Sequence, residues 1–229
     1  MTMKRVSTVV AVLGAGLLVT ACDIEQPSAG CVVQDSINWI ARYDLKEGQP
    51  TCVRPLPPGE LVGVFKYRDP NKENSNVLAL RPAGLASRGA RDTSSDQSKQ
   101  TAIGSLGSEV DANDFCKAET LSEASVAAAS SDTEDATQIS YKFSNVEVYS
   151  APRAPGTQLR ADLTYTRDGC TAEYEVHAMW PARPCDPAHP EEPALNCGKG
   201  SLINPDMAVT CHPTLKLCVL AKDVPSFVD

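Results

Sequence analysis

The sequence has few of the residues that enzymes use most often, with three histidines among 229 residues. It contains neither the G-x-S-x-G turn of α/β-hydrolases nor the H-E-x-x-H motif of zinc proteases. The paired C-x2–4-C ligands that are typical of structural zinc sites are also missing. These absences argue against the common hydrolase and zinc-protein classes, and we expect neither a metal ion nor a cofactor.

Long apolar runs and positive charge are scarce as well. Outside the N-terminal segment, no window approaches the roughly 18 apolar residues of a membrane-spanning helix. The formal net charge is −8 at pH 7. This charge argues against nucleic acid, whose phosphates would repel the chain, and against membrane binding through a basic patch. We therefore expect no nucleic-acid partner.

The N-terminal segment is typical of a secretory signal. Lys4 and Arg5 precede an uncharged run from Val6 to Val19. As a helix this run rises about 21 Å, which is shorter than the roughly 30 Å hydrocarbon core of a bilayer. A positive start, a short apolar run and small residues at its end predict export and removal of the segment.

The end of this segment, "VTAC" (Val19–Cys22), resembles the lipobox of bacterial lipoproteins. In such proteins the cysteine thiol forms a thioether to a diacylglyceryl group, and small residues such as Thr20 and Ala21 let the peptidase approach the backbone. The resemblance implies a signal peptide at 1–21, lipidation at Cys22 and attachment to the membrane through acyl chains, because two chains give stable anchoring. The alternative is an ordinary signal peptide with a chance cysteine.

These features predict a lipid-anchored protein of the cell envelope, on the outer membrane and facing the periplasm or the surface. Asp23 leaves the choice of membrane open, because aspartate at this place resembles an inner-membrane retention signal of enteric bacteria. The predicted tether, residues 22–30, spans at most about 32 Å when extended. We expect the folded body to lie close to the bilayer.

Eight cysteines follow Cys22, an even number in a chain that is expected to be exported. An oxidising compartment favours disulfides, so we predict a disulfide framework. Eight cysteines allow on the order of a hundred pairings, and we favour nearest neighbours. The predicted bridges are Cys31–Cys52, Cys116–Cys170, Cys185–Cys197 and Cys211–Cys218. The alternative is zinc, bound by His189 and His212 with nearby cysteines.

Alternation of apolar and polar residues predicts an all-β fold. The pattern is clearest from Ile139 to Trp180, where three segments predict an antiparallel meander. Asp168-Gly169 predicts a type I′ turn between its last two strands. Earlier strands are predicted within 38–45, 60–67 and 76–81. The residues expected on one face of the first strand are Trp39, Ala41, Tyr43 and Leu45. We predict an antiparallel β-sandwich or partly open barrel.

The remaining stretches predict loops. Residues 85–100 are polar and lack a period, and residues 117–137 combine helix formers with small acidic residues, which predicts a loop with one helix. Residues 181–229 hold four cysteines and many prolines, so we expect a loop-rich, disulfide-stapled C-terminal cap that ends in a hairpin at "CHPTLKLC". Residues 31–229 are predicted to form a single domain that includes this cap.

Candidate sites for chemistry are weak. His177 could serve a Ser-His-Asp triad, but strand alternation predicts a solvated histidine there. Residues 111–119 and 130–136 cluster carboxylates without the ligand spacing of an EF-hand, so we interpret them as solvated loops. "CGKGS" (197–201) lacks the spacing of a phosphate-binding loop. A pair of acids for glycosidase chemistry stays open, although nothing singles one out. We predict no catalytic residue.

A wider resemblance rests on "YSAPRAPGTQLRADLTYTRDGCTAEYEV" (149–176), "CVVQDSINW", "LALRPAGL" and "INPDMAVTC". These runs resemble cysteine-rich lipoproteins found in myxobacteria. Their motifs are turn, strand and disulfide signatures, and the resemblance implies no assigned activity. We therefore predict an acylated envelope lipoprotein that acts as a non-enzymatic binding or structural module, with an envelope protein or polysaccharide as partner. The alternative is an envelope hydrolase.

Overall fold

The computed structural model describes residues 30–47, 52–72, 75–94, 96–118 and 120–229. Cys22, the predicted signal segment and all of the predicted tether except Gly30 lie outside these residues. Among the described residues, no helix has the length and apolarity to cross a membrane.

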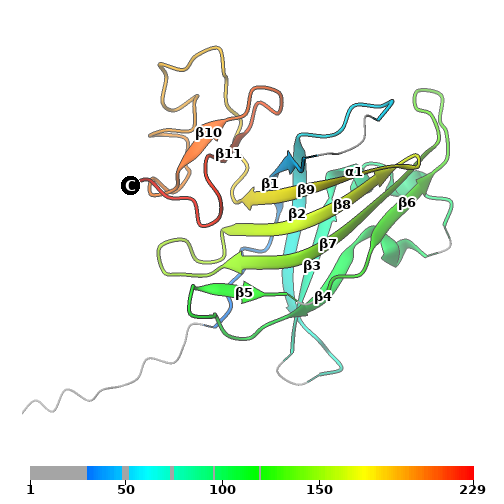
Figure 1. Cartoon of the computed structure of the whole chain (residues 1–229), viewed down its shortest axis with the longest axis horizontal. Coiled ribbons are helices and arrows are strands. Elements are labelled where there is room, and N and C mark those ends of the chain that lie inside the picture. Colours follow the sequence, from blue (N-terminus) through cyan, green and yellow to red (C-terminus); the bar gives the residue numbers. More distant parts are fainter. Residues whose placement is uncertain (1–29, 48–51, 73–74, 95, 119) are drawn as a thin grey trace, which may run out of the picture.

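The described chain folds mainly into antiparallel strands that curve into one large sheet (Figure 1). Helical structure is limited to α1 (Ala83–Ala86) and two 3-10 turns (Gly89–Arg91 and Gln97–Gln100). The strands are β1 (Ser36–Leu45), β2 (Gly59–Arg68), β3 (Asn76–Pro82), β4 (Ala102–Leu106), β5 (Phe115–Lys117), β6 (Ala124–Ala128), β7 (Thr137–Tyr149), β8 (Gln158–Arg167), β9 (Cys170–Met179), β10 (Val209–Cys211) and β11 (Cys218–Leu220). The all-β prediction is confirmed.

The large sheet curves into a nearly closed barrel. Its strand order is β4-β3-β2-β1-β9-β8-β7-β5, and β6 also pairs with β7. The two end strands meet where Leu106 of β4 forms a bridge with Ala118, just after β5. Beside this bridge the backbone N–H of Gly107 donates to the carbonyl of Lys117 at 2.9 Å. Of the two predicted architectures, the β-sandwich and the partly open barrel, the structure agrees with the barrel, which is nearly closed.

The barrel interior is filled by the alternate residues that the sequence pattern predicts. Trp39, Ala41 and Tyr43 of β1 are buried, whereas Leu45 at the end of this strand is 48% exposed. The predicted meander forms as β7-β8-β9. Asp168 and Gly169 have φ angles of 50° and 81°, the positive values that a type I′ turn requires.

One row of outward-facing residues is also buried, because the C-terminal segment covers it. The row crosses five neighbouring strands and consists of Ile40, Met179, Gln158, Tyr149 and Phe115. The β10-β11 hairpin and the segment after it pack on this row and form a second hydrophobic core (Figure 1). We call residues 181–229 the cap.

The disulfide pairing predicted from nearest neighbours is wrong at all four bridges. The structure joins Cys31–Cys116, Cys52–Cys170, Cys185–Cys211 and Cys197–Cys218. The cost of closing a loop grows slowly with its length, so short loops have little advantage and the folded contacts decide the pairing. Cys211 and Cys218 do face each other across β10-β11, yet each bonds to the loop that precedes the hairpin.

The two predicted loops contain more regular structure than expected. The helix predicted within 117–137 is absent from the described part of that stretch, which instead contributes β6, because Ala124, Val126 and Ala128 alternate inward and the strand pairs with β7. Residues 85–100 hold the end of α1 and both 3-10 turns. Gln100 anchors them: it is 4% exposed, and its amide donates to the carbonyl of Gly89 at 3.2 Å.

Candidate functional site

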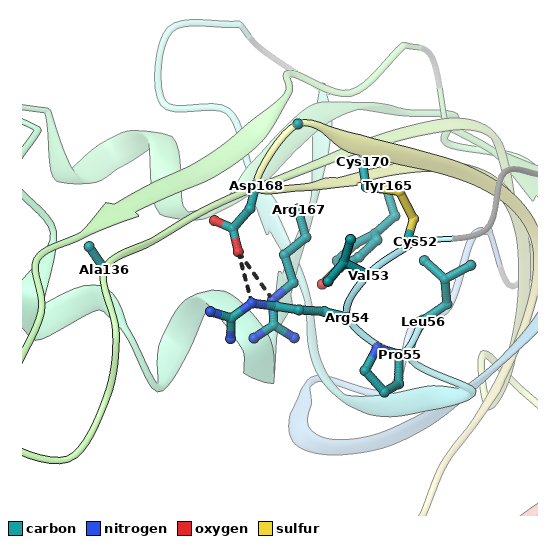
Figure 2. A pocket seen from close by; sticks show the side chains of 11 residues that line it. Cys52, Val53, Arg54, Pro55, Leu56, Ala136, Tyr165, Arg167, Asp168 and Cys170 are labelled. Atoms are coloured by element: carbon teal, nitrogen blue, oxygen red, sulfur yellow. Dashed lines mark ion pairs between the residues drawn. A yellow bond between two sulfur atoms is a disulfide. The ribbon is translucent and has the colours of Figure 1, made fainter.

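A cavity of about 680 Å³ opens at the barrel end formed by the β8-β9 turn and the segment that follows β1 (Figure 2). Residues 52–56 form one wall, and residues 165–170 form the other. The Cys52–Cys170 bridge fastens the two walls together. The cavity is therefore built on strand ends and held by a covalent link.

The first wall and the floor of this cavity are largely apolar. Val53 is fully exposed to solvent, and Pro55 and Leu56 follow it along the same segment. Tyr165 lies between these residues and the barrel interior (Figure 2). An exposed apolar surface next to a cavity is typical of binding sites for ligands with an apolar part.

Two guanidinium groups line the same cavity, with one carboxylate between them (Figure 2). Oδ2 of Asp168 lies 3.5 Å from Nε of Arg54 and 3.8 Å from Nε of Arg167. Arg54 also pairs at 3.2 Å with Asp135, whose side chain is 82% exposed. Nε of Arg167 is buried and has no hydrogen-bond partner in the described structure. A buried N–H of this kind is costly to leave unpaired, so it marks a place for an acceptor.

A cluster of tyrosines around the half-buried carboxylate of Glu60 lies behind Tyr165. The rings of Tyr165 and Tyr141 pack edge to face with centroids 5.1 Å apart. The hydroxyls of Tyr141 and Tyr43 donate to Oε1 of Glu60 at 2.7 and 3.2 Å, and the N–H of Gly84 donates to Oε2 at 2.5 Å. Burial raises the pKa of the Glu60 carboxyl, although these three hydrogen bonds oppose the rise. The cluster closes the barrel end from inside.

Tyr174 belongs to the same cluster but lacks a partner for its hydroxyl. Its ring centroid is 5.6 Å from that of Tyr43 and 6.4 Å from that of Tyr165. The hydroxyl is buried and forms no hydrogen bond with any residue that the structure describes, and burial raises its pKa to about 12, with a smaller contribution from Tyr165. The Tyr174 hydroxyl therefore stays protonated at neutral pH.

The prediction that His177 is solvated is wrong. It lies on the outer face of β9, as alternation predicts, but it is 5% exposed because the cap covers its edge. Its Nε2 lies 3.4 Å from Oδ2 of Asp44 and 3.6 Å from Oδ1 of Asp223 in the cap. Burial lowers the pKa of His177 and Arg42 lowers it further, while the carboxylates oppose them. No serine is among the described residues that line the cavity beside His177.

The other two histidines have surface or turn positions. Nδ1 of His212 accepts from the backbone N–H groups of Thr214 and Leu215 at 3.3 and 3.2 Å, which fixes the turn between β10 and β11. His189 is exposed in the cap beside Glu191 and Glu192. The three histidines are thus not brought together in one site.

The remaining sequence candidates have structural roles where the structure describes them. The carboxylate of Asp111 accepts from the backbone N–H groups of Asn113 and Phe115 and so shapes its own turn. Glu134 pairs with Arg91. The sulfur atoms of Cys185, Cys197 and Cys218 lie close together, but each belongs to a disulfide, which removes the thiolates that zinc needs.

Comparison with known proteins gives this barrel a family. A family model named MlpA matches residues 37–181, which run from β1 to the end of the meander. The chain belongs to the MlpA family. A curated MlpA relative, "Putative lipoprotein MlpA" from Myxococcus xanthus, is 45% identical over 237 residues, covering 99% of this chain and 100% of the relative. The predicted resemblance to myxobacterial lipoproteins is confirmed. No solved structure matches the chain.

Both walls of the cavity, residues 52–56 and 165–170, fall inside the region matched by the MlpA model, whereas the cap from residue 182 onward lies outside it. Sequence reasoning identified the Asp168-Gly169 turn that carries one wall but missed the functional groups beside it. Arg54 and Arg167 belong to no recognisable sequence motif, and nothing in the sequence distinguishes Glu60 from other polar residues at strand ends. The signal that could have found them is the set of tyrosines on inward positions of four predicted strands, namely Tyr43, Tyr141, Tyr165 and Tyr174.

Proposed function

We propose that this MlpA protein is a lipid-anchored protein of the cell envelope that binds a small amphipathic anion, without chemical conversion, in the cavity beside Arg54 and Arg167. The Nε of Arg167 carries this proposal, because it is buried and forms no hydrogen bond with a described residue, its nearest anionic partner being Asp168 at 3.8 Å. It lies against an apolar wall, so the cavity offers a place for an alkyl chain next to a place for an anionic oxygen.

Charge around the cavity supports an anionic head group. Two guanidinium groups share Asp168 as the one carboxylate in the lining, and Asp135 is a second, highly exposed partner for Arg54. A carboxylate or phosphate can accept from both guanidinium groups, because such forks match the oxygen spacing of these anions. Such hydrogen bonds are stronger in a partly desolvated cavity than at the open surface.

The predicted anchor supports the same class of ligand. Lipidation at Cys22 with a tether of about 32 Å would hold the cavity near a bilayer, where fatty acids and phospholipids are amphipathic anions. The name of the relative from Myxococcus xanthus, a lipoprotein, agrees with this anchor. The proposal includes that the lipid anchor lies in the outer membrane.

Calorimetric titration with dodecanoate and with dodecyl phosphate tests the binding, and a non-ionic alkyl maltoside serves as the uncharged comparison. We expect the two anions to bind with one site and the maltoside to bind at least tenfold more weakly. Arg167→Gln should weaken anion binding by about 10- to 100-fold, because hydrogen bonds to charged groups contribute about 1.5–3 kcal/mol.

Arg153→Gln provides the control, because Arg153 does not line the cavity, pairs with Asp206 at 3.2 Å and packs on Phe227 of the cap. Its anion affinity should equal that of the wild type. Equal affinity for all three amphiphiles, or equal losses in the Arg153 and Arg167 variants, would contradict the proposal. Turnover of an ester or glycoside substrate that depends on cavity residues would favour the hydrolase alternative instead.

A further inference from the structure

One part of the outer barrel wall, over β2, β3 and β4, is apolar. Its side chains alternate with the buried residues of the same strands, so they point away from the barrel interior. Ile37, which is 76% exposed, joins them from the bulge of β1 opposite Gly63. The residues of this apolar face are Ile37, Leu61, Phe65, Tyr67, Val77 and Ile103.

The residues of the apolar face are neighbours across the strands, so they form one continuous surface. Tyr67 lies opposite Val77, and Phe65 and Ile103 lie on either side of Ala79. The six residues of the face belong to neither hydrophobic core of the described chain. The cap hairpin packs elsewhere, against β9 and β1 (Figure 1).

The charge on this wall differs from that on the opposite wall. The outward positions of β8 and β9 include Arg160, Asp162, Glu173 and Glu175. The outward positions of β2 and β3 hold Arg81 as their single charge and no carboxylate, in a chain with 29 acidic residues. Strands that are apolar on both faces are usually covered on both, so the apolar face is a surface onto which something docks.

Cations lie at both ends of the apolar face. Arg68 ends β2 and is exposed, and Arg81 is exposed on β3 opposite Gly63. The carboxylate of Asp69, which follows β2, accepts from the backbone N–H of Asn71 at 2.9 Å. An apolar surface that lacks carboxylates and has arginines at its ends is complementary to an anionic lipid surface.

The chain that leads to the predicted anchor starts beside this face. Nζ of Lys66, in the middle of the apolar residues of β2, donates to the carbonyl of Cys31. The predicted tether, residues 22–30, spans at most about 32 Å when extended. The ten residues of β2 extend over about the same length. A bilayer that holds Cys22 is therefore within reach of the whole apolar face.

We infer that the apolar face lies on the surface of an anionic lipid bilayer, with Tyr67 at the level of the head groups and Arg68 and Arg81 beside their phosphates. Tyrosine favours this interface because its ring is apolar and its hydroxyl is polar. Apolar contact carries the docking, and the two arginines add attraction to anionic lipids. A second copy of the chain would bring the same arginines to the interface without a carboxylate on the face to pair with them.

Fluorescence quenching in vesicles tests the inference, with bromine atoms on the acyl chains as the quencher. The lipid-anchored protein is reconstituted into vesicles of phosphatidylethanolamine and phosphatidylglycerol, with and without brominated chains. Tyr67→Trp should lose most of its added fluorescence in the brominated vesicles. Ser144→Trp is the matched control, because Ser144 is exposed on β7, and it should lose none. Trp39 is fully buried in the barrel and should not respond.

A charge on the apolar face should prevent docking. Ile37→Asp, combined with Tyr67→Trp, should abolish the quenching, because a carboxylate would have to leave water at the interface. The high exposure of Ile37 means that this variant should keep its fold. Ser144→Asp should leave the quenching of Tyr67→Trp unchanged.

The inference is overturned if Tyr67→Trp is not quenched, if Ser144→Trp is quenched equally, or if Ile37→Asp has no effect. Sedimentation of the detergent-solubilised protein identifies the competing occupant. A dimer that Ile37→Asp dissociates, without quenching of Tyr67→Trp, would assign the face to a second copy and overturn docking on the bilayer.

The inference rests on the anchor of the proposed function, and the two fail in different ways. An anchored protein that floats with the vesicles but shows no quenching contradicts docking alone. A chain without lipid on Cys22 that still floats and is quenched contradicts the anchor alone. A chain that carries no lipid and does not float contradicts both. Anion binding in the cavity beside Arg54 and Arg167 does not enter this test.

Discussion

Replacing Cys52 and Cys170 together by alanine removes the covalent link between the two walls of the cavity beside Arg54 and Arg167. The Cys31–Cys116 bridge already connects the same regions of the chain. The smallest loop that the Cys52–Cys170 bridge closes therefore runs through that other bridge and holds about 75 residues, for which loop-closure entropy predicts a loss of about 4.5 kcal/mol in the free energy of unfolding.

The matched comparison is the double alanine variant of Cys197 and Cys218 in the cap. There the Cys185–Cys211 bridge shortens the loop to about 20 residues, and the same relation predicts a loss of about 3.3 kcal/mol. The variant that lacks the Cys52–Cys170 bridge should therefore be less stable than the variant that lacks the Cys197–Cys218 bridge. Both variants keep three of the four bridges.

Urea unfolding followed by tryptophan fluorescence measures the difference, because Trp39 is fully buried in the barrel and reports its opening. With a slope of about 2 kcal/mol/M, the midpoint of the cavity variant should fall by roughly 2 M relative to the wild type. A fall of less than about 0.5 M, or a larger fall in the cap variant, would refute the reasoning from loop closure.

Three further predictions concern single residues. A fatty-acid analogue should label the wild type, whereas Cys22→Ala should lose both the label and the membrane fraction. Burial raises the pKa of Glu60 in the folded state, so the stability that the protonated carboxyl contributes is complete below pH 4.5 and is lost as the pH rises through the folded pKa. The melting temperature should therefore decline above pH 4.5, and Glu60→Gln should make this decline smaller. Gly84→Ala should lower the free energy of unfolding by about 1–3 kcal/mol, measured in urea, because its Cβ would lie 2.3 Å from the Tyr141 hydroxyl oxygen. Labelled Cys22→Ala, an unchanged pH profile or a fully stable Gly84→Ala would each contradict the corresponding argument.

The barrel strands were predictable because apolar and polar residues alternate along each strand, and this pattern is visible in consecutive residues. The alternation in β7, β8 and β9 predicted both the meander and its inward face, and Asp168-Gly169 predicted the turn. The helix prediction within 117–137 was wrong because small residues such as Ala127 and Ala128 suit either element, and pairing with β7 decided between them. Local propensity is a weak guide where tertiary pairing is available.

The cavity and the cap contacts depend on residues far apart in the chain, which no local pattern reveals. Arg54 and Arg167 meet only because β8 ends beside the segment that follows β1. Ile40 lies on the strand face that the sequence pattern predicts to be polar and exposed, and only the cap buries it. His177 was interpreted as solvated because the cap contact is likewise not visible in the local sequence. The predicted disulfide pairing was wrong for the same reason, because the fold and not the order of the cysteines in the chain decides which of them meet.

The Cys31–Cys116 bridge has a mechanical consequence. Cys31 is where the described chain enters the barrel, and its backbone N–H bonds to the carbonyl of Ser108, just after β4, while its disulfide reaches β5. These contacts lie on both sides of the short junction between β4 and β5. A force that pulls on the N-terminal segment would therefore be shared between both edge strands through Cys31, so it would not act on one strand alone.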